Sequence, residues 1–232
     1  GNLMKKLITG ILLVVMMLSL AACGGDTADD DSSNTGAVYH VGVCQLVEHD
    51  ALDAATEGFV DALEEKLGDA VEIEVQLAQG EPNNCTTIIN NFVAGNVDLI
   101  MANATPALQA AVSGTDTIPI LGTSVTEYGV ALGIDNFNGT VGGNVSGTSD
   151  LAPLDGQAAM IQELFPEAKK VGLLYCSAEA NSQYQIDVVT EELTKLGYEC
   201  TPYSFSDSND LATVATSAAE NSDVIYVPTD NK

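Results

Sequence analysis

Arginine is absent from this chain of 232 residues, and all seven of its basic residues are lysines. Against them stand 33 aspartates and glutamates, which give a formal net charge of −26 at pH 7. Nucleic acids and anionic lipid headgroups are bound through clusters of lysine and arginine, so this composition argues against nucleic acid as a partner. The lack of arginine also means that a carboxylate on a ligand must be held by backbone N–H groups, hydroxyls, amides or one of few lysines.

Histidine is scarce as well, with only two in the chain. A thiol dyad of Cys44 and His49 is disfavoured because residues five apart at a strand end point in different directions, and no segment marks an oxyanion hole. Glu48, His49 and Asp53 lack a recognised spacing of metal ligands. No phosphate-loop or dinucleotide-binding glycine motif is present either. We therefore expect no enzyme activity, no cofactor and no metal.

The N-terminus combines a short positive region, Met4-Lys5-Lys6, with the apolar run Leu7–Leu20 and the sequence Leu20-Ala21-Ala22-Cys23. This pattern resembles a bacterial lipoprotein signal, which implies cleavage before Cys23 and lipidation of its thiol. The apolar run is shorter than the ~20 residues that span a bilayer. We expect residues 1–22 to be a signal peptide and the mature protein to be anchored to the bacterial cell membrane through Cys23, on its extracytoplasmic side.

Residues 23–37 differ in composition from the rest of the chain. They hold four aspartates among glycine, serine, threonine and asparagine. Such a segment cannot bury enough apolar surface to order itself, so we expect a flexible acidic tether.

Strand and helix patterns alternate from residue 38 onward. Apolar runs with β-branched residues predict strands, and apolar spacing of three and four predicts helices. The predicted strands are 38–47, 71–77, 97–102 and 118–121, and the predicted helices are 50–67, 84–94 and 106–112. This alternation implies a parallel, doubly wound sheet in an N-terminal α/β lobe, 38–143.

A stretch rich in glycine and small polar residues, 142–150, interrupts the alternation. Its glycines give the backbone the freedom that a hinge needs, so residues 144–150 are predicted to be a crossover between lobes. The pattern then resumes in a second α/β lobe, 151–232. The predicted helices there are 155–165, 182–196 and 211–220, and the predicted strands are 170–175, 199–205 and 224–227.

Four ordered runs carry a family resemblance. They are Val41–His49, Gly143–Asp150, Glu179–Ser182 and Tyr226–Asn231. Together with the lipoprotein signal, these runs resemble the substrate-binding lipoproteins of ABC importers, in the group that includes tryptophan and tyrosine binders. The resemblance implies the α/β fold of a type I periplasmic binding protein. Two Rossmann-like lobes with parallel sheets would close on a solute and dock on an ABC permease.

Members of this family continue past the Pro-Thr-Asp-Asn motif at residues 228–231, so we expect the second lobe to be incomplete in this chain.

Ligands of open α/β sheets bind outside the carboxyl ends of the strands. Polar residues recur at these ends on both lobes, although any one of them can be merely a helix cap. The predicted ligand-binding residues are Gln45, Glu48, Thr105, Ser124, Thr148, Asp150, Asn181, Ser182, Thr229, Asp230 and Asn231.

A zwitterionic amino acid needs an anion site and a cation site close together. With no arginine, its carboxylate would go to backbone N–H groups at helix N-termini and to hydroxyls, and its ammonium to a carboxylate. The candidate hydroxyls are Thr105, Thr148 and Ser182, the candidate carboxylates Glu48, Asp150 and Asp230, and the orienting amides Gln45, Asn181 and Asn231. Tyr128 and Tyr175 are possible stacking partners for an aromatic side chain, although aromatics are more often core residues.

Two other functions stay open. A purine-nucleoside-binding lipoprotein would call for more aromatic residues at the strand ends than this sequence offers. A lipid-anchored sensor module would use the same cleft to report on a solute. A cytoplasmic sugar-type repressor shares the two-lobed fold, but it would need a basic helix-turn-helix in front, and the lipoprotein signal occupies that place.

Four cysteines follow Cys23, namely Cys44, Cys85, Cys176 and Cys200. Buried free thiols are the expected state. If a disulfide forms, Cys44 and Cys85 are the favoured pair, since both lie near the ligand-side edge of the first sheet. Cys176 and Cys200 would lie at opposite ends of theirs.

Overall fold

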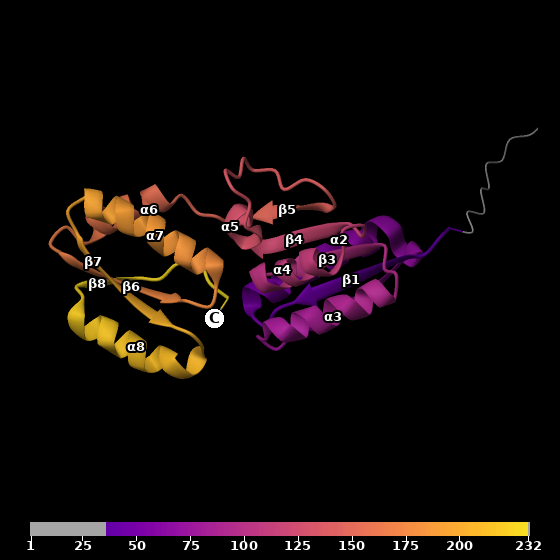
Figure 1. Cartoon of the computed structure of the whole chain (residues 1–232), viewed down its shortest axis with the longest axis horizontal. Coiled ribbons are helices and arrows are strands. Elements are labelled where there is room, and N and C mark those ends of the chain that lie inside the picture. Colours follow the sequence, from indigo (N-terminus) through magenta and orange to yellow (C-terminus); the bar gives the residue numbers. More distant parts are fainter. Residues whose placement is uncertain (1–35, 232) are drawn as a thin grey trace, which may run out of the picture. The chain divides into compact units, whose positions relative to one another are not determined.

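The computed structural model describes residues 36–231, which form an α/β structure with two parallel sheets (Figure 1). The predicted signal peptide, Cys23 and all but the last two residues of the tether lie outside the described residues. Within residues 36–231, no helix has both the length and the apolar character needed to cross a membrane.

The first sheet has five strands in the order β2-β1-β3-β4-β5, all parallel. Its strands are β1 (Tyr39–Gln45), β2 (Val71–Leu77), β3 (Leu99–Asn103), β4 (Ile120–Val125) and β5 (Val145–Ser149). Its helices are α2 (Asp50–Leu67), the 3-10 turn η1 (Gly68–Ala70), α3 (Pro82–Ala94), α4 (Thr105–Gly114) and α5 (Tyr128–Leu132). The predicted strand and helix alternation is confirmed.

Successive side chains of β1 point to opposite faces of the first sheet, and their contacts show which helix covers each face. Gly42 faces α3, because a Cβ at this position would lie 2.6 Å from the ring of Phe92. Gln45, which has the opposite parity, hydrogen-bonds Thr56 of α2. The β1 segment Val41–Gln45 is buried throughout, as expected of a strand covered on both faces.

The second sheet has three parallel strands in the order β7-β6-β8. Its strands are β6 (Lys170–Cys176), β7 (Glu199–Phe205) and β8 (Val224–Tyr226), and its helices are α6 (Leu154–Leu164), α7 (Ala180–Lys195) and α8 (Ser208–Asn221). Leu173 of β6 belongs to the core shared with α6 and α7, whereas Leu174 packs with residues of α8. Figure 1 shows α6 and α7 on one side of this sheet and α8 on the other.

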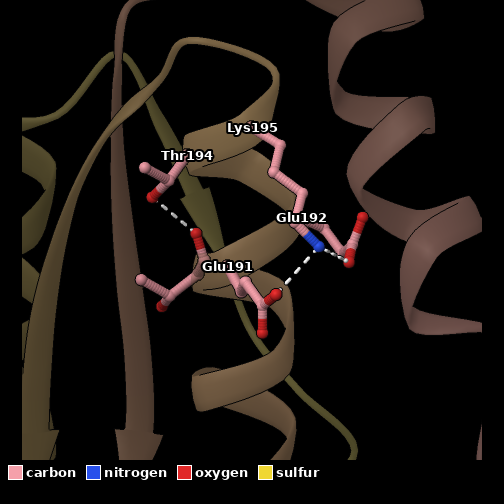
Figure 2. Close-up of polar contacts among 5 residues, drawn as sticks. Glu191, Glu192, Thr194 and Lys195 are labelled. Carbon is pink, nitrogen blue, oxygen red and sulfur yellow. Dashed lines mark hydrogen bonds and ion pairs between the residues drawn. The ribbon is translucent and has the colours of Figure 1, made fainter.

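At the end of α7, the side chain of one lysine forms ion pairs with two glutamates of the preceding turn. Lys195 Nζ lies 2.9 Å from an oxygen of Glu191 and 2.9 Å from an oxygen of Glu192 (Figure 2). A cation in the last turn also interacts favourably with the helix dipole. The hydrogen bonds to the two carboxylates raise the pKa of Lys195, but the group is exposed to solvent, which weakens such pairs.

The segment predicted as a crossover contains a strand that the sequence analysis missed. Val145–Ser149 forms β5, which pairs with β4 at the edge of the first sheet. Gly147 is required by this packing, since a Cβ there would collide with the backbone of Gly122 and with the hydroxyl of Tyr128. The hinge role of residues 144–150 and the predicted lobe boundaries stay predictions.

Candidate functional site

A network of buried polar side chains lies at the carboxyl ends of β1 and β3. Gln45 is 1% exposed, and its Oε1 accepts a hydrogen bond of 2.6 Å from Thr56 Oγ1. Its Nε2 donates to Asp53 Oδ1 at 2.5 Å. Asn103 Nδ2 donates to Thr56 Oγ1 at 2.9 Å and to the carbonyl of Leu52 at 2.8 Å. Both ends of the Gln45 amide are therefore used to hold α2 against the strand ends.

The start of α4 combines backbone strain with a buried hydroxyl. Ala104 has φ 90°, a value that L-residues rarely adopt, and it directly precedes Thr105. Thr105 is 1% exposed, and its Oγ1 has no hydrogen-bond partner within the described chain. Ser124, at the end of the neighbouring strand β4, has φ 54°. Strained residues of this kind cluster at binding and active sites, because the surrounding structure must hold them in place.

The first turns of α7 meet the segment that follows β8. Ser182 Oγ donates to Asp230 Oδ2, and Asn231 Nδ2 donates to Glu179 Oε2 at 3.1 Å. Gln185 forms two hydrogen bonds with the backbone of Thr229, from its Nε2 to the carbonyl at 2.8 Å and from the Thr229 N–H to its Oε1 at 3.1 Å. Four predicted site residues, Ser182, Thr229, Asp230 and Asn231, are thus brought together.

Asn181 connects this cluster with the first sheet. Its Nδ2 donates to Thr126 Oγ1 at 3.5 Å, and Thr126 directly follows β4. Both side chains are buried, at 1% and 2% exposure. Asn181 Oδ1 has no hydrogen-bond partner within residues 36–231, and the same is true of Asn103 Oδ1. A buried polar atom without a partner costs free energy, so these atoms mark places where a ligand or a water can bind.

Three other predicted site residues lie on the surface. Glu48 is exposed at the start of the turn into α2. Thr148 is exposed and donates from its Oγ1 to Thr123 Oγ1 at 3.5 Å, beside a cavity of about 300 Å³. Asp150 is exposed, and its backbone N–H donates to the carbonyl of Val125 at 3.3 Å. The structure does not show any of them in contact with the cluster at α7.

The two tyrosines considered as stacking partners both belong to hydrophobic cores. Tyr128 is 6% exposed, and its hydroxyl donates to the carbonyl of Thr148 at 2.9 Å. Burial raises the pKa of Tyr128 to about 12, and the charge of the Asp150 carboxylate contributes to the rise. Tyr175 is 9% exposed and packs in the core of the second sheet. Tyr175 is thus a packing residue, whereas Tyr128 also lines a cavity.

A larger cavity, of about 550 Å³, adjoins Thr126. Its size lies within the range of small-molecule pockets, roughly 300–1,000 Å³. It is lined by Thr126, Glu127, Tyr128, Phe137, Gly139, Thr140, Val141, Gly142, Val145, Ser146, Gly147, Ser149 and Leu151. Apolar side chains supply much of this lining, as is usual for ligand pockets.

Several residues of the site were missing from the predicted set, among them Gln185, Asn103, Thr126 and the buried carboxylate Glu179. The last three all lie at strand ends or in a run that carried the family resemblance. Their positions in the sequence could have indicated a role in binding, but only the structure shows that they are buried and which atoms they contact. Among residues 36–231, no group of three histidine, cysteine, aspartate or glutamate residues is arranged to hold a metal ion.

Comparisons with known proteins find similar sequences and structures. Residues 40–232 match the family described as ABC transporter substrate binding protein. A tyrosine-binding protein of Clostridioides difficile (strain R20291) is 40% identical over 195 residues, which cover 83% of this chain and 56% of that protein. The chain therefore spans little more than half the length of this relative.

Two solved structures are similar along most of the described chain. An ABC domain from Streptococcus pneumonia in complex with L-Trp has a TM-score of 0.78 and 31% identity, covering 84% of this chain and 66% of that one. A conserved domain protein from Vibrio cholerae has a TM-score of 0.76 and 36% identity, covering 82% of this chain and 64% of that one. These similarities confirm the predicted α/β fold class of a type I periplasmic binding protein.

Proposed function

Because the chain belongs to the ABC transporter substrate-binding protein family, we propose that it is the receptor of an ABC importer that captures an aromatic amino acid. The family assignment confirms that this is a binding protein and not an enzyme. The observation that carries the proposal is the set of buried polar atoms without a partner in the described chain, Asn103 Oδ1, Thr105 Oγ1 and Asn181 Oδ1. All three lie at strand ends or in the first turn of a helix.

The start of α4 suits the carboxylate of an amino acid. The N–H groups of the first turn of a helix have no partner within the helix, and the helix dipole favours an anion there. Thr105 Oγ1 adds a buried hydroxyl that can donate to the same carboxylate. This is the kind of anion site that a chain without arginine must use.

The segment after β8 suits the ammonium group. Asp230 and Glu179 are carboxylates held by Ser182 and Asn231, and Glu179 is only 3% exposed. A carboxylate in a closed cleft binds an ammonium through a charge-assisted hydrogen bond worth roughly 1.5–3 kcal/mol. Asn181, which contacts Thr126 after β4, can orient the ligand, and ligand contacts to both groups of residues would shift the population toward a closed form.

The aromatic nature of the ligand rests on the relatives. The similar protein of Clostridioides difficile is named for tyrosine, and the similar structure from Streptococcus pneumonia holds L-Trp. Delivery to a membrane permease, extracytoplasmic location and anchoring through lipidated Cys23 belong to the same proposal. A variant Cys23→Ser tests the anchor: it should leave the membrane fraction of a bacterial host, whereas the unchanged chain should stay there.

A thermal-shift screen of the chain tests the ligand. It uses the twenty amino acids, several purine nucleosides and several sugars. A ligand at 100 times its Kd adds ~2.7 kcal/mol of stability, which is roughly 5–10 °C in Tm for a chain of this size. We expect shifts with tryptophan, tyrosine or phenylalanine. A shift with nucleosides alone contradicts the proposal and favours the nucleoside-binding alternative.

Two carboxylate variants then test the ammonium site. Asp230→Ala and Asp150→Ala should each weaken amino-acid binding without loss of the fold. The structure favours Asp230, which contacts Ser182, over the exposed Asp150. Asp187→Ala, an exposed carboxylate in the middle of α7, is the matched control. Unchanged affinity in both test variants overturns the assignment.

A further inference from the structure

Two cysteines lie side by side in the core of the first sheet, and the binding function does not use them. Cys44 is in β1 and Cys85 is in the first turn of α3. Both are 0% exposed and belong to the same hydrophobic core. Both are free thiols in this structure. The expected burial holds for Cys44, Cys85 and Cys176, whereas Cys200 is only partly buried.

The packing of α3 on β1 fixes this pair. Gly42 and Cys44 share one face of β1, because they are two residues apart. Phe92 and Cys85 share one face of α3, because they are seven residues apart. The Phe92 ring occupies the space above Gly42, 2.6 Å from the position of a Cβ there. Two turns earlier in α3, Cys85 accepts a hydrogen bond from the thiol of Cys44.

Hydrogen bonds also link the end of β1 to the segment that leads into α3. The Ala78 N–H donates to the carbonyl of Gln45 at 2.9 Å, and the Gly80 N–H donates to the carbonyl of Leu46 at 2.7 Å. Asn84, the neighbour of Cys85, donates from its Nδ2 to the carbonyl of Ala78 at 3.0 Å. These bonds connect the residues that follow Cys44 with the segment that precedes Cys85.

The other two described cysteines are arranged differently. Cys200 is paired with Val171 in the register of β6 and β7, whereas Cys176 is paired with Phe205. Five residues along a strand separate the two positions by ~16 Å, far beyond the ~7 Å limit on the Cα distance of a disulfide. Cys176 donates its S–H to the carbonyl of Ser206 at 3.8 Å. Cys176 and Cys200 therefore serve as a comparison pair that is too far apart to form a disulfide.

We propose that Cys44 and Cys85 are a cross-linking site, at which a small-molecule disulfide such as oxidised glutathione converts the two thiols into an intramolecular disulfide. In the first exchange, the Cys85 thiolate attacks one glutathione sulfur, the glutathione S–S bond breaks, and one glutathione leaves as a thiol after taking up a proton. In the second, Cys44 loses its proton and attacks the Cys85 sulfur, which releases the second glutathione. The protein loses two electrons and two protons, and both pass to glutathione.

Cys85 is the thiol suited to the first attack. The hydrogen bond from Cys44 lowers the pKa of Cys85, since it stabilises a thiolate there. Burial opposes this effect and also denies the oxidant access to the folded core. The exchange therefore takes place late in folding, when α3 has already brought the two thiols together but the core still admits the oxidant. Oxidising conditions outside the cytoplasm would supply the oxidant.

The cross-link closes a segment that includes α2, η1 and β2. Closing a loop of about 40 residues removes entropy from the unfolded chain, which corresponds to a rise in Tm on the order of 10 °C for a protein of this size. The cross-link would also fix the end of β1 at Cys44, next to Gln45 of the buried network.

The test unfolds the full chain in guanidinium chloride and refolds it in a buffer of oxidised and reduced glutathione. Free thiols are then blocked with N-ethylmaleimide, and the disulfide-linked peptides are mapped by mass spectrometry. We expect one linked peptide pair, which joins Cys44 to Cys85, and a Tm raised by on the order of 10 °C over a sample refolded with reductant. The folded reduced chain should react far more slowly than the refolding chain.

Single variants serve as controls. Cys44→Ala should abolish the linked peptide and the oxidant-dependent rise in Tm, and Cys176→Ala, at another fully buried thiol, should change neither. Because the mapping on the unchanged chain needs no variant, a misfolded variant does not decide the matter. Full alkylation of Cys44 and Cys85 after refolding with oxidant overturns the proposal, and so does a link from either of them to another cysteine.

Discussion

Removal of the Thr105 hydroxyl should change the stability of the unliganded protein and its affinity for the ligand in opposite directions. Thr105→Val keeps the shape and the β-branching of the side chain and removes only the hydroxyl. In the unliganded structure, Thr105 Oγ1 is buried and has no partner within the described chain. A buried polar group in that state costs about 1–3 kcal/mol. We therefore expect the variant without ligand to be more stable by about 1–3 kcal/mol, or roughly 2–12 °C in Tm.

The effect on binding should have the opposite sign. If the hydroxyl donates to the carboxylate of the ligand, its loss removes a hydrogen bond to a charged group, worth roughly 1.5–3 kcal/mol. This corresponds to a rise in Kd of roughly 10- to 150-fold. Thermal melts without ligand and calorimetric titration with the amino acid found in the screen measure the two quantities separately.

Thr87→Val is the matched control for this substitution. Thr87 is an exposed residue of α3, and its Oγ1 donates to the carbonyl of Asn83 at 3.2 Å. Its replacement should change stability by less than about 0.5 kcal/mol and leave Kd unchanged. A fall in the stability of Thr105→Val would show that the hydroxyl has a partner in the unliganded protein. An unchanged Kd would remove Thr105 from the anion site.

Three further predictions address pH, packing and charge. Burial raises the pKa of Tyr128 and of Tyr226 from 10.0 to about 12, so the folded chain holds these phenol protons more tightly than the unfolded chain. Their contribution to the free energy of unfolding is fully present below about pH 10 and is lost as the pH rises toward 12. Denaturant melts of the unchanged chain and of Tyr→Phe variants across that range measure this loss. Gly42→Ala should destabilise the fold by ~1–3 kcal/mol through collision with Phe92, and Phe92→Leu in the same chain should recover part of that loss. Asp230→Asn should weaken amino-acid binding, because the amide lacks the negative charge that attracts the ammonium; equal affinities of the variant and the unchanged chain in calorimetric titration would contradict a charge-based contact.

Local patterns were sufficient to predict most of the elements. The helix Asp50–Leu67 and the strands Val71–Leu77 and Glu199–Phe205 were predicted with the bounds that the structure shows. Each has a clear apolar period between residues that favour turns or caps. The start of α3 was placed two residues late, since Pro82 begins the helix at a position where its missing N–H costs nothing.

Two elements carry too little local signal to be predicted. The short helix α5 is stabilised by its setting, in which Glu127 caps Val130 N–H and Tyr128 is buried. The sequence of β5 resembles a flexible hinge, because three of its five residues are serine or glycine. Its identity as a strand depends on pairing with β4, and pairing between distant segments is not encoded in local composition.

The sequence by itself determined the α/β class, the family and the strand ends where a ligand should bind, because periodicity and ordered motifs are local properties of the chain. Only the tertiary structure decided which polar residues are available at those ends. Gln45 is used up by Thr56 and Asp53, whereas Thr105 and Asn181 keep buried atoms without a partner in the described chain. The same holds for the thiols, since the contact of Cys44 with Cys85 follows from the packing of α3 on β1. Burial and partnership depend on segments far apart in sequence, and they decide what a polar side chain can do.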